Sequence, residues 1–301
     1  MVDRGADPKA GSMTSLYSGL AIGAVYALVA MGYNVVFLAS GVFNFAQAQY
    51  VTLGGFVGAV AAGAHGAPMW VVVPAGAVLG GLAGALQERL TIRPIRGGDG
   101  GGHNELITTI GVAVLIEGLV LVFFGPDPLS VPFPGGAQPI TLLGGTVLPV
   151  EIALVVVAVL VAAALALFLR RTSWGLAALA CAEDRDAARL RGIDVRTVAV
   201  GAFALAGALG FAVGPLVASK TLAVFSLGTA VALKSFVALA LGGFGSQAGA
   251  LFGGFAIGLV EAATVRWLGT EFGLLAVFVL LLGVLLVRPN GMFGNAAGRP
   301  A

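Results

Sequence analysis

The sequence predicts an all-α polytopic membrane protein of about eight transmembrane helices, some of them broken. The first observation is composition: 58% of the 301 residues are hydrophobic and only 10% are charged, whereas roughly a quarter of the residues of a soluble domain are charged. The second is a mean hydropathy of +1.01. The third is that apolar runs of about 20 residues, the length that crosses a bilayer as a helix, recur along the chain.

Seven of these runs are continuous enough to predict spanning helices directly. They cover residues 15–38, 68–86, 105–124, 149–169, 196–218, 248–266 and 270–287.

Two further runs contain polar side chains within otherwise apolar sequence. These are 44–64, with Asn44, Gln47 and Gln49, and 225–244, with Lys234. Irregular polar backbone is not tolerated where it faces lipid. We therefore expect both runs to be broken helices or to line a protected cavity, for a total of about eight to nine crossings.

Arginine placement predicts the orientation of the spans. The arginines that follow apolar runs are Arg89, Arg93 and Arg96, six residues within 170–196, and Arg288. Because arginine-rich loops stay on the cytoplasmic side, the spans 105–124 and 149–169 form an outward hairpin. The loop 125–148 between them is then external.

We divide the chain into a polar N-terminal tail (1–14), a transmembrane domain (15–294) and a C-terminal tail (295–301). Inside the external loop, the β-prone runs 140–143 and 146–148 flank Gly144-Gly145. A Gly-Gly connection between such runs predicts a short β-hairpin on the outer face.

Glycine pairs at four-residue spacing recur in the apolar runs. They are Gly19/Gly23, Gly54/Gly58, Gly80/Gly84, Gly210/Gly214 and Gly245/Gly249/Gly253. This spacing places small residues on one helix face, so that two backbones can approach closely. We expect tight packing between helices of this chain; a seam between two copies is the alternative.

The segment 170–196 holds ten of the 30 charged residues. Its pattern predicts two short helices: Thr172 or Ser173 caps the first, Asp184 caps the second, and Gly192 ends it. Acids precede bases in the second helix, since Asp186 lies in its first turn and Arg189 in its last, which suits the helix dipole.

The same segment has apolar surface to bury, contributed by Trp174, Leu176, Leu179, Leu190 and Ile193. Two interpretations remain at this point. One is an ordinary solvated cytoplasmic loop, and the other is a docking element for a cytoplasmic partner.

Four blocks of the sequence, in order, resemble the permease subunits of branched-chain amino acid ABC importers. They are "GLAIGAVYALVAMGYNVVFLASGVFNFAQAQYVTLGGF", "RRTSWGLAALACAEDRDAARLRGID", "LKSFVALALGGFGSQAGALFGGFAIGLVEA" and "VRPNGMFG". The resemblance covers residues 15–294, and the second block is similar to the family's cytoplasmic coupling loop.

The resemblance implies an ATP-driven importer for branched-chain (aliphatic) amino acids in the bacterial cytoplasmic membrane. The implied partners are two cytoplasmic ATPase subunits, a second permease subunit of a different chain, and an extracytoplasmic solute-binding protein. The residues implied in ATPase coupling are Trp174, Leu179, Glu183, Asp184, Arg185, Arg189 and Gly192.

Asn44, Gln47 and Gln49 are the predicted substrate-pathway residues, because unpaired amides facing hydrocarbon would cost several kcal/mol. The family pattern there reads Asn-Phe-Ala-His-Gly-Glu or close to it, whereas this chain has neutral amides at 47 and 49. On one helix Asn44 and Gln47 share a face, and we expect them to point inward toward a hydrated cavity. Amides, urea and other small polar solutes stay open as alternative substrates.

Several function classes are disfavoured. No G-x-x-x-x-G-K-[ST] motif is present, so we expect no cofactor in this chain and ATP bound and hydrolysed by a partner. A net charge of +2 does not indicate nucleic-acid binding, and one cysteine and two histidines do not indicate a metal site. Glu117, inside a span, keeps a proton-coupled secondary transporter as the runner-up.

Overall fold

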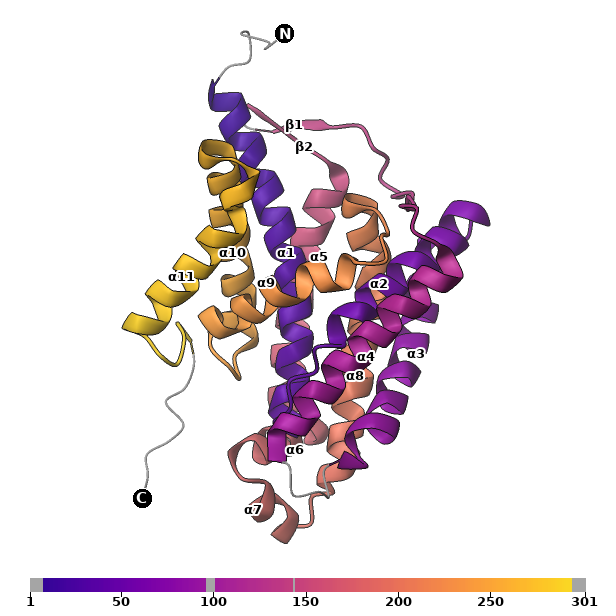
Figure 1. Cartoon of the computed structure of the whole chain (residues 1–301), viewed down its shortest axis with the longest axis vertical. Coiled ribbons are helices and arrows are strands. Elements are labelled where there is room, and N and C mark those ends of the chain that lie inside the picture. Colours follow the sequence, from indigo (N-terminus) through magenta and orange to yellow (C-terminus); the bar gives the residue numbers. More distant parts are fainter. Residues whose placement is uncertain (1–7, 96–100, 143, 294–301) are drawn as a thin grey trace.

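The computed structural model describes residues 8–95, 101–142 and 144–293 (Figure 1). Residues 1–7 of the predicted N-terminal tail, Arg96, Leu143 and the predicted C-terminal tail 295–301 lie outside the described residues. The first helix, α1, begins at Pro8, so its first turns lie within the stretch assigned to the N-terminal tail.

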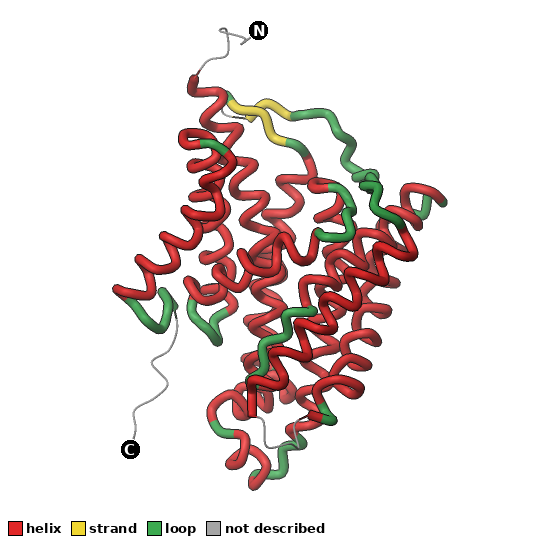
Figure 2. Tube along the Cα trace, viewed as in Figure 1, coloured by secondary structure: helices red, strands yellow, loops and turns green. Residues whose placement is uncertain are grey.

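The described residues are mainly helical (Figure 2), and seven helices are long and apolar enough to cross a membrane. The seven predicted continuous spans are therefore confirmed. They are α1 (Pro8–Ser40), α3 (Met69–Gln87) continued by the π-helical η2 (Glu88–Ile92), α4 (Gly101–Phe124), α5 (Pro149–Arg171), α8 (Val195–Thr221), α10 (Gln247–Leu268) and α11 (Gly273–Val287) preceded by the 3-10 turn η4 (Thr270–Phe272).

The two irregular runs form shorter helices, each entered from a non-helical segment. Gln47–Gly58 is α2, which continues into the π-helical η1 (Ala59–Ala64), and Leu227–Gly242 is α9. The polar first half of α2 is buried against other helices, as expected for polar groups that must avoid lipid.

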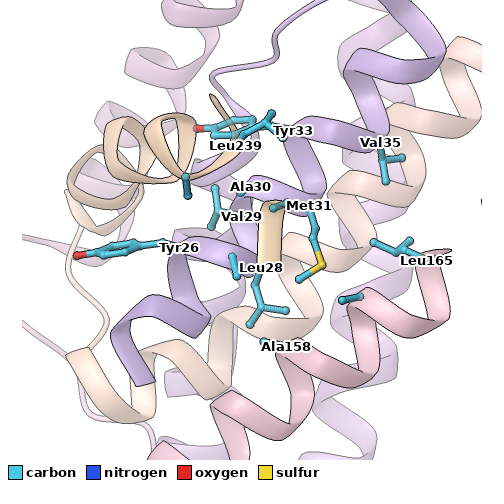
Figure 3. Close-up of a cluster of buried hydrophobic side chains, with 14 of the residues drawn as sticks. Tyr26, Leu28, Val29, Ala30, Met31, Tyr33, Val35, Ala158, Leu165 and Leu239 are labelled. Carbon is cyan, nitrogen blue, oxygen red and sulfur yellow. The ribbon is translucent and has the colours of Figure 1, made fainter. Parts of the chain in front are cut away.

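The core lies around α1. The apolar window of α1 is 83% buried, whereas those of α4 and α11 are each 11% buried, so α1 is central and the other two are peripheral. Figure 3 shows Met31 and Tyr33 of α1 packed with Leu165 of α5 and Leu239 of α9. The centre of the bundle is thus assembled from helices distant in sequence.

Two glycine seams bring helices into backbone contact, as the four-residue spacing predicted. A Cβ built on Gly23 of α1 would lie 2.8 Å from the carbonyl oxygen of Gly254 in α10, and one on Gly19 would lie 3.0 Å from that of Gly258. In the same way Gly80 of α3 meets α8. These contacts occur between helices of one chain, so internal packing is confirmed as the role of these glycines.

The predicted hairpin is present at the end of the molecule where α1 begins (Figure 1). Strand β1 (Ile140–Leu142) pairs antiparallel with β2 (Gly145–Val147), with Leu142 opposite Gly145. The prediction of Gly144-Gly145 as the connecting pair was wrong by one residue. Gly145 belongs to the ladder, and Gly144, at φ +82°, supplies the turn conformation that glycine adopts without strain.

The hairpin is held to α1. The Tyr17 hydroxyl donates to the Leu142 carbonyl at 3.1 Å, and the Thr146 amide donates to the Thr14 hydroxyl at 3.0 Å. The charged loop of α6 and α7 lies at the opposite end of the molecule (Figure 1), as the arginine pattern predicted.

Candidate functional site

The charged loop folds into the two predicted short helices, α6 (Ser173–Glu183) and α7 (Arg185–Leu190). The Thr172 hydroxyl accepts from the Gly175 amide at 3.0 Å and so caps α6. Asp184 caps α7 by accepting from the amides of Asp186 and Ala187 at 2.8 and 3.0 Å. Gly192, at φ +84°, follows α7 as the predicted C-terminal stop.

The loop is anchored to the membrane-spanning body at two points. Trp174 packs on Phe168, with ring centroids 5.5 Å apart, and its indole lies so close to α8 that a Cβ on Gly201 would be 2.7 Å from Nε1. The Arg185 guanidinium reaches the end of α1, where a Cβ on Gly41 would be 2.7 Å from Nη2. The loop therefore contacts both α8 and the end of α1.

The expected coupling residues separate into inner and outer groups. Trp174, Leu179 and Arg185 are partly buried, whereas Glu183, Asp184, Arg189 and Gly192 are exposed.

Two apolar residues of the loop are more exposed than expected. Leu176 of α6 is 54% exposed. Leu190, which we expected to be buried, is 90% exposed at the end of α7. The Asp184 cap and the exposed Arg189–Asp186 ion pair at 2.9 Å stabilise the short helix that presents it, and none of the described residues buries its side chain.

Local contacts shift the pKa values of two ionisable groups of the loop. Burial raises the pKa of the Cys181 thiol, although nearby Arg185 and Arg189 act in the opposite direction. Hydrogen bonds from Thr197, and from the Arg196 amide, lower the pKa of Asp194. Asp194 is the N-cap of α8, so the carboxylate joins the loop to a spanning helix.

The three amides assigned to the substrate pathway are all buried inside the protein. The Gln47 amide donates to the Ala206 carbonyl of α8 at 2.6 Å. The Gln49 amide donates to the Thr229 hydroxyl of α9 at 2.9 Å. Asn44 precedes α2, so the expectation that Asn44 and Gln47 share one helix face was wrong, because the chain is not helical before residue 47.

Asn44 has a partner that the sequence did not reveal, Gln87 at the end of α3. Its amide donates to Gln87 Oε1 at 3.0 Å, and Gln87 Nε2 donates to Asn44 Oδ1 at 2.8 Å. The Tyr50 hydroxyl also donates to Gln87 Oε1 at 2.6 Å. The sequence feature that could have pointed to Gln87 is its position as a lone amide at the end of an apolar run, next to the charged Glu88 and Arg89.

The structure places the amides in contacts between helices. A cavity of about 320 Å³ lies away from these amides, between α3, α5, α8 and the segment 125–148. Its lining is apolar, with residues such as Val73, Val161 and Leu216.

Glu151, Glu261 and Glu117 are three of the carboxylates in the spanning helices. Glu151 of α5 pairs with Lys220 of α8, and Glu261 of α10 pairs with Lys234 of α9. The Tyr26 hydroxyl donates to Glu261 at 2.7 Å. Glu117 of α4 instead accepts hydrogen bonds from the Thr229 hydroxyl and from the Gln49 amide, the latter at 3.3 Å.

A family model described as "Branched-chain amino acid transport system / permease component" matches residues 15–287. The chain belongs to this family. The permease is a multi-pass membrane transport component of the bacterial inner membrane.

Relatives match the permease over nearly its whole length. The high-affinity branched-chain amino acid transport system permease protein BraD of Pseudomonas aeruginosa is 30% identical over 94% of this chain and 96% of its own. The high-affinity branched-chain amino acid transport system permease protein LivH of Escherichia coli (strain K12) is also 30% identical, over 94% of this chain and 96% of its own. The probable branched-chain amino acid transport permease LivH of Methanocaldococcus jannaschii is 24% identical over 93% of this chain. No solved structure matches the permease.

Proposed function

We propose that this chain is the membrane-spanning pore subunit of an ATP-driven importer that carries branched-chain amino acids. The named substrates of BraD and LivH support this substrate class. The proposed complex contains two cytoplasmic ATPase subunits, a second permease subunit of a different chain, and an extracytoplasmic binding protein that delivers the substrate. ATP is bound and hydrolysed by the ATPase subunits.

The observation that carries the proposal is the capped pair of helices α6 and α7 with Leu190 uncovered at its tip. An exposed leucine framed by charged side chains suits a groove on a partner protein, because fully burying a leucine contributes about 1.5–3 kcal/mol. Glu183, at the end of α6, and Arg189, in the last turn of α7, are both exposed and offer charges for pairing with the partner.

The anchoring of the loop supports a coupling role. A solvated loop needs only net positive charge to fulfil the positive-inside rule. The contacts of Trp174 with α8 and of Arg185 with the end of α1 provide a rigid path from the ATPase to two spanning helices. ATP-driven closure of the ATPase pair would tilt these helices and open the pathway alternately to each side.

For the substrate pathway we propose the region where α2 meets α8 and α9, with Gln47 and Gln49 as polar groups and Asn44 at its entry. Broken helices with polar groups near the midplane are the usual construction of transporter binding sites. Amides, urea or other small polar solutes are the second candidate substrates, because the amides at 47 and 49 carry no charge.

The coupling role is tested by Leu190→Ser. We expect a folded, membrane-inserted permease whose affinity for the ATPase falls about tenfold to hundredfold, since the lost burial is about 1.5–3 kcal/mol. Co-purification with the ATPase and substrate-stimulated ATP hydrolysis are the measurements. Ala182→Ser, also exposed on this loop, is the matched control and should behave as wild type.

A second variant permutes the charges of residues 183–191 at constant composition. If the loop is merely solvated, uptake stays normal, because the net charge on the cytoplasmic side is unchanged. Normal uptake by both the permuted loop and Leu190→Ser would refute coupling through this segment. A third experiment measures uptake after the proton gradient is collapsed while ATP is maintained. A proton-coupled transporter would lose uptake under these conditions, whereas an ATP-driven importer would keep it.

A further inference from the structure

Three carboxylates of the spanning helices, Glu117, Glu151 and Glu261, differ in how their charge is compensated. Glu151 and Glu261 each pair with a lysine of a neighbouring helix. In the part of the chain that the structure describes, Glu117 has hydrogen bonds only to the uncharged groups of Gln49 and Thr229. Ionisable groups are costly in a membrane and mark functional sites there, so the position of Glu117 among uncharged groups needs an explanation.

The surroundings of Glu117 favour a carboxylate at this position. Thr229 lies in the first turn of α9, and Glu117 therefore sits at the N-terminus of a 16-residue helix, where the helix dipole is positive. The Gln49 side chain is held by close packing, because a Cβ on Gly228 would lie 2.5 Å from Gln49 Oε1 and 2.8 Å from Thr52 Oγ1. Three helices, α2, α4 and α9, thus meet at one carboxylate.

The carboxylate has an oxygen available to a ligand. Both described hydrogen bonds go to Oε2, so among the described contacts Oε1 keeps its acceptor positions. Glu117 is half-buried, while Thr229 and Ala230 beside it are exposed, and a Cβ on the adjacent Gly118 would meet nothing within 4 Å. The site is therefore open on the outer surface of this subunit.

We propose that Glu117, positioned by Gln49 and Thr229, binds the α-ammonium group of the amino acid during its passage. This inference rests on the proposed substrate class. An ammonium group brings one positive charge and three donors, which match a carboxylate that has neutral donors on one oxygen and a free second oxygen. Charge-assisted hydrogen bonds of this kind are about twice as strong as neutral ones, so the site selects substrates that carry an amino group.

The experiment measures radiolabelled leucine binding to the assembled permease–ATPase complex in nanodiscs, without the binding protein. Competitors are unlabelled leucine, isoamylamine, which keeps the ammonium and lacks the carboxylate, and 2-hydroxy-4-methylpentanoate, which lacks the ammonium. We expect isoamylamine to compete with wild type and the hydroxy acid to compete poorly. E117Q should weaken leucine binding about tenfold or more and abolish the preference for isoamylamine, and E117D should retain that preference.

The matched control is E261Q, which changes a carboxylate already paired with Lys234 and should retain the preference for isoamylamine whatever its effect on stability. Co-purification of E117Q with the ATPase checks its folding.

Wild-type leucine uptake tests the proposed function separately. If wild type imports leucine and E117Q binds it as tightly with the same competitor preference, the ammonium site is refuted while the importer stands. If E117Q binds leucine normally but loses uptake that depends on the proton gradient, Glu117 is a proton relay and the inference is equally overturned.

Discussion

The charged loop of α6 and α7 and the polar cluster at α2 satisfy their polar groups in opposite ways. In the loop, Asp184 finds its partners two and three residues away in sequence. In the membrane, Asn44 bonds to Gln87 at a separation of 43 residues, and Gln49 bonds to Thr229 at a separation of 180. The first region is organised locally, and the second only by the assembled helices.

The difference follows from the solvent of each region. A polar group of the loop that loses its partner can bond to water, so caps contribute stability without being indispensable. A polar group within the bilayer has no water to replace a lost partner, and each orphaned group is costly. Equal-sized substitutions in the two regions should therefore have unequal effects.

The largest effect is expected for Gln87→Leu. This substitution leaves Asn44 and the Tyr50 hydroxyl, both buried, without the hydrogen bonds they make to Gln87. Each orphaned group costs about 1–3 kcal/mol, so thermal unfolding in detergent should occur at a clearly lower temperature. Leu86→Ala, at the exposed neighbouring position, is the control. If Gln87→Leu and wild type unfold at the same temperature, the expected difference between the two regions is wrong.

A smaller, local effect is expected for Asp184→Ala in the loop. Loss of the N-cap costs about 1 kcal/mol, which should speed amide hydrogen exchange over Arg185–Leu190 and leave the spanning helices unchanged. Asp186→Asn, which removes only the exposed pair with Arg189, should change the same exchange by about 0.5 kcal/mol or less. Destabilisation of the whole permease by Asp184→Ala would show that the loop is not an independent local unit.

The smallest effect is expected for the pH response of Asp194. Its pKa is lower in the folded state than the usual 3.8, so its stabilising contribution is present above pH 3.8 and is lost as the pH falls through the folded pKa. Trp174, which packs against α8, should report this change by fluorescence in a variant carrying Trp70→Phe and Trp267→Phe. Adding Asp194→Asn, which still caps but does not titrate, should flatten the acid response.

Hydropathy and local chemistry determined much of this protein from the sequence alone. The seven long helices follow from apolar runs of sufficient length, since the bilayer sets that length for any sequence. Thr172, Asp184 and Gly192 act where their residue types predict, because caps and left-handed turns involve only neighbours in the chain. The four-residue glycine spacing likewise predicted backbone contact between helices.

Only the tertiary structure decided which helices meet and which polar groups become partners. Gly23 packs against Gly254, and Gln87 satisfies the hydrogen bonding of Asn44. Glu261 pairs with Lys234, whereas Glu117 bonds to the Thr229 hydroxyl. All of these contacts join residues that are distant in sequence. Hydrophobicity is nearly uniform along these helices and does not single out a neighbour within lipid. The choice rests on close packing and paired hydrogen bonds, which exist only when distant segments are already side by side.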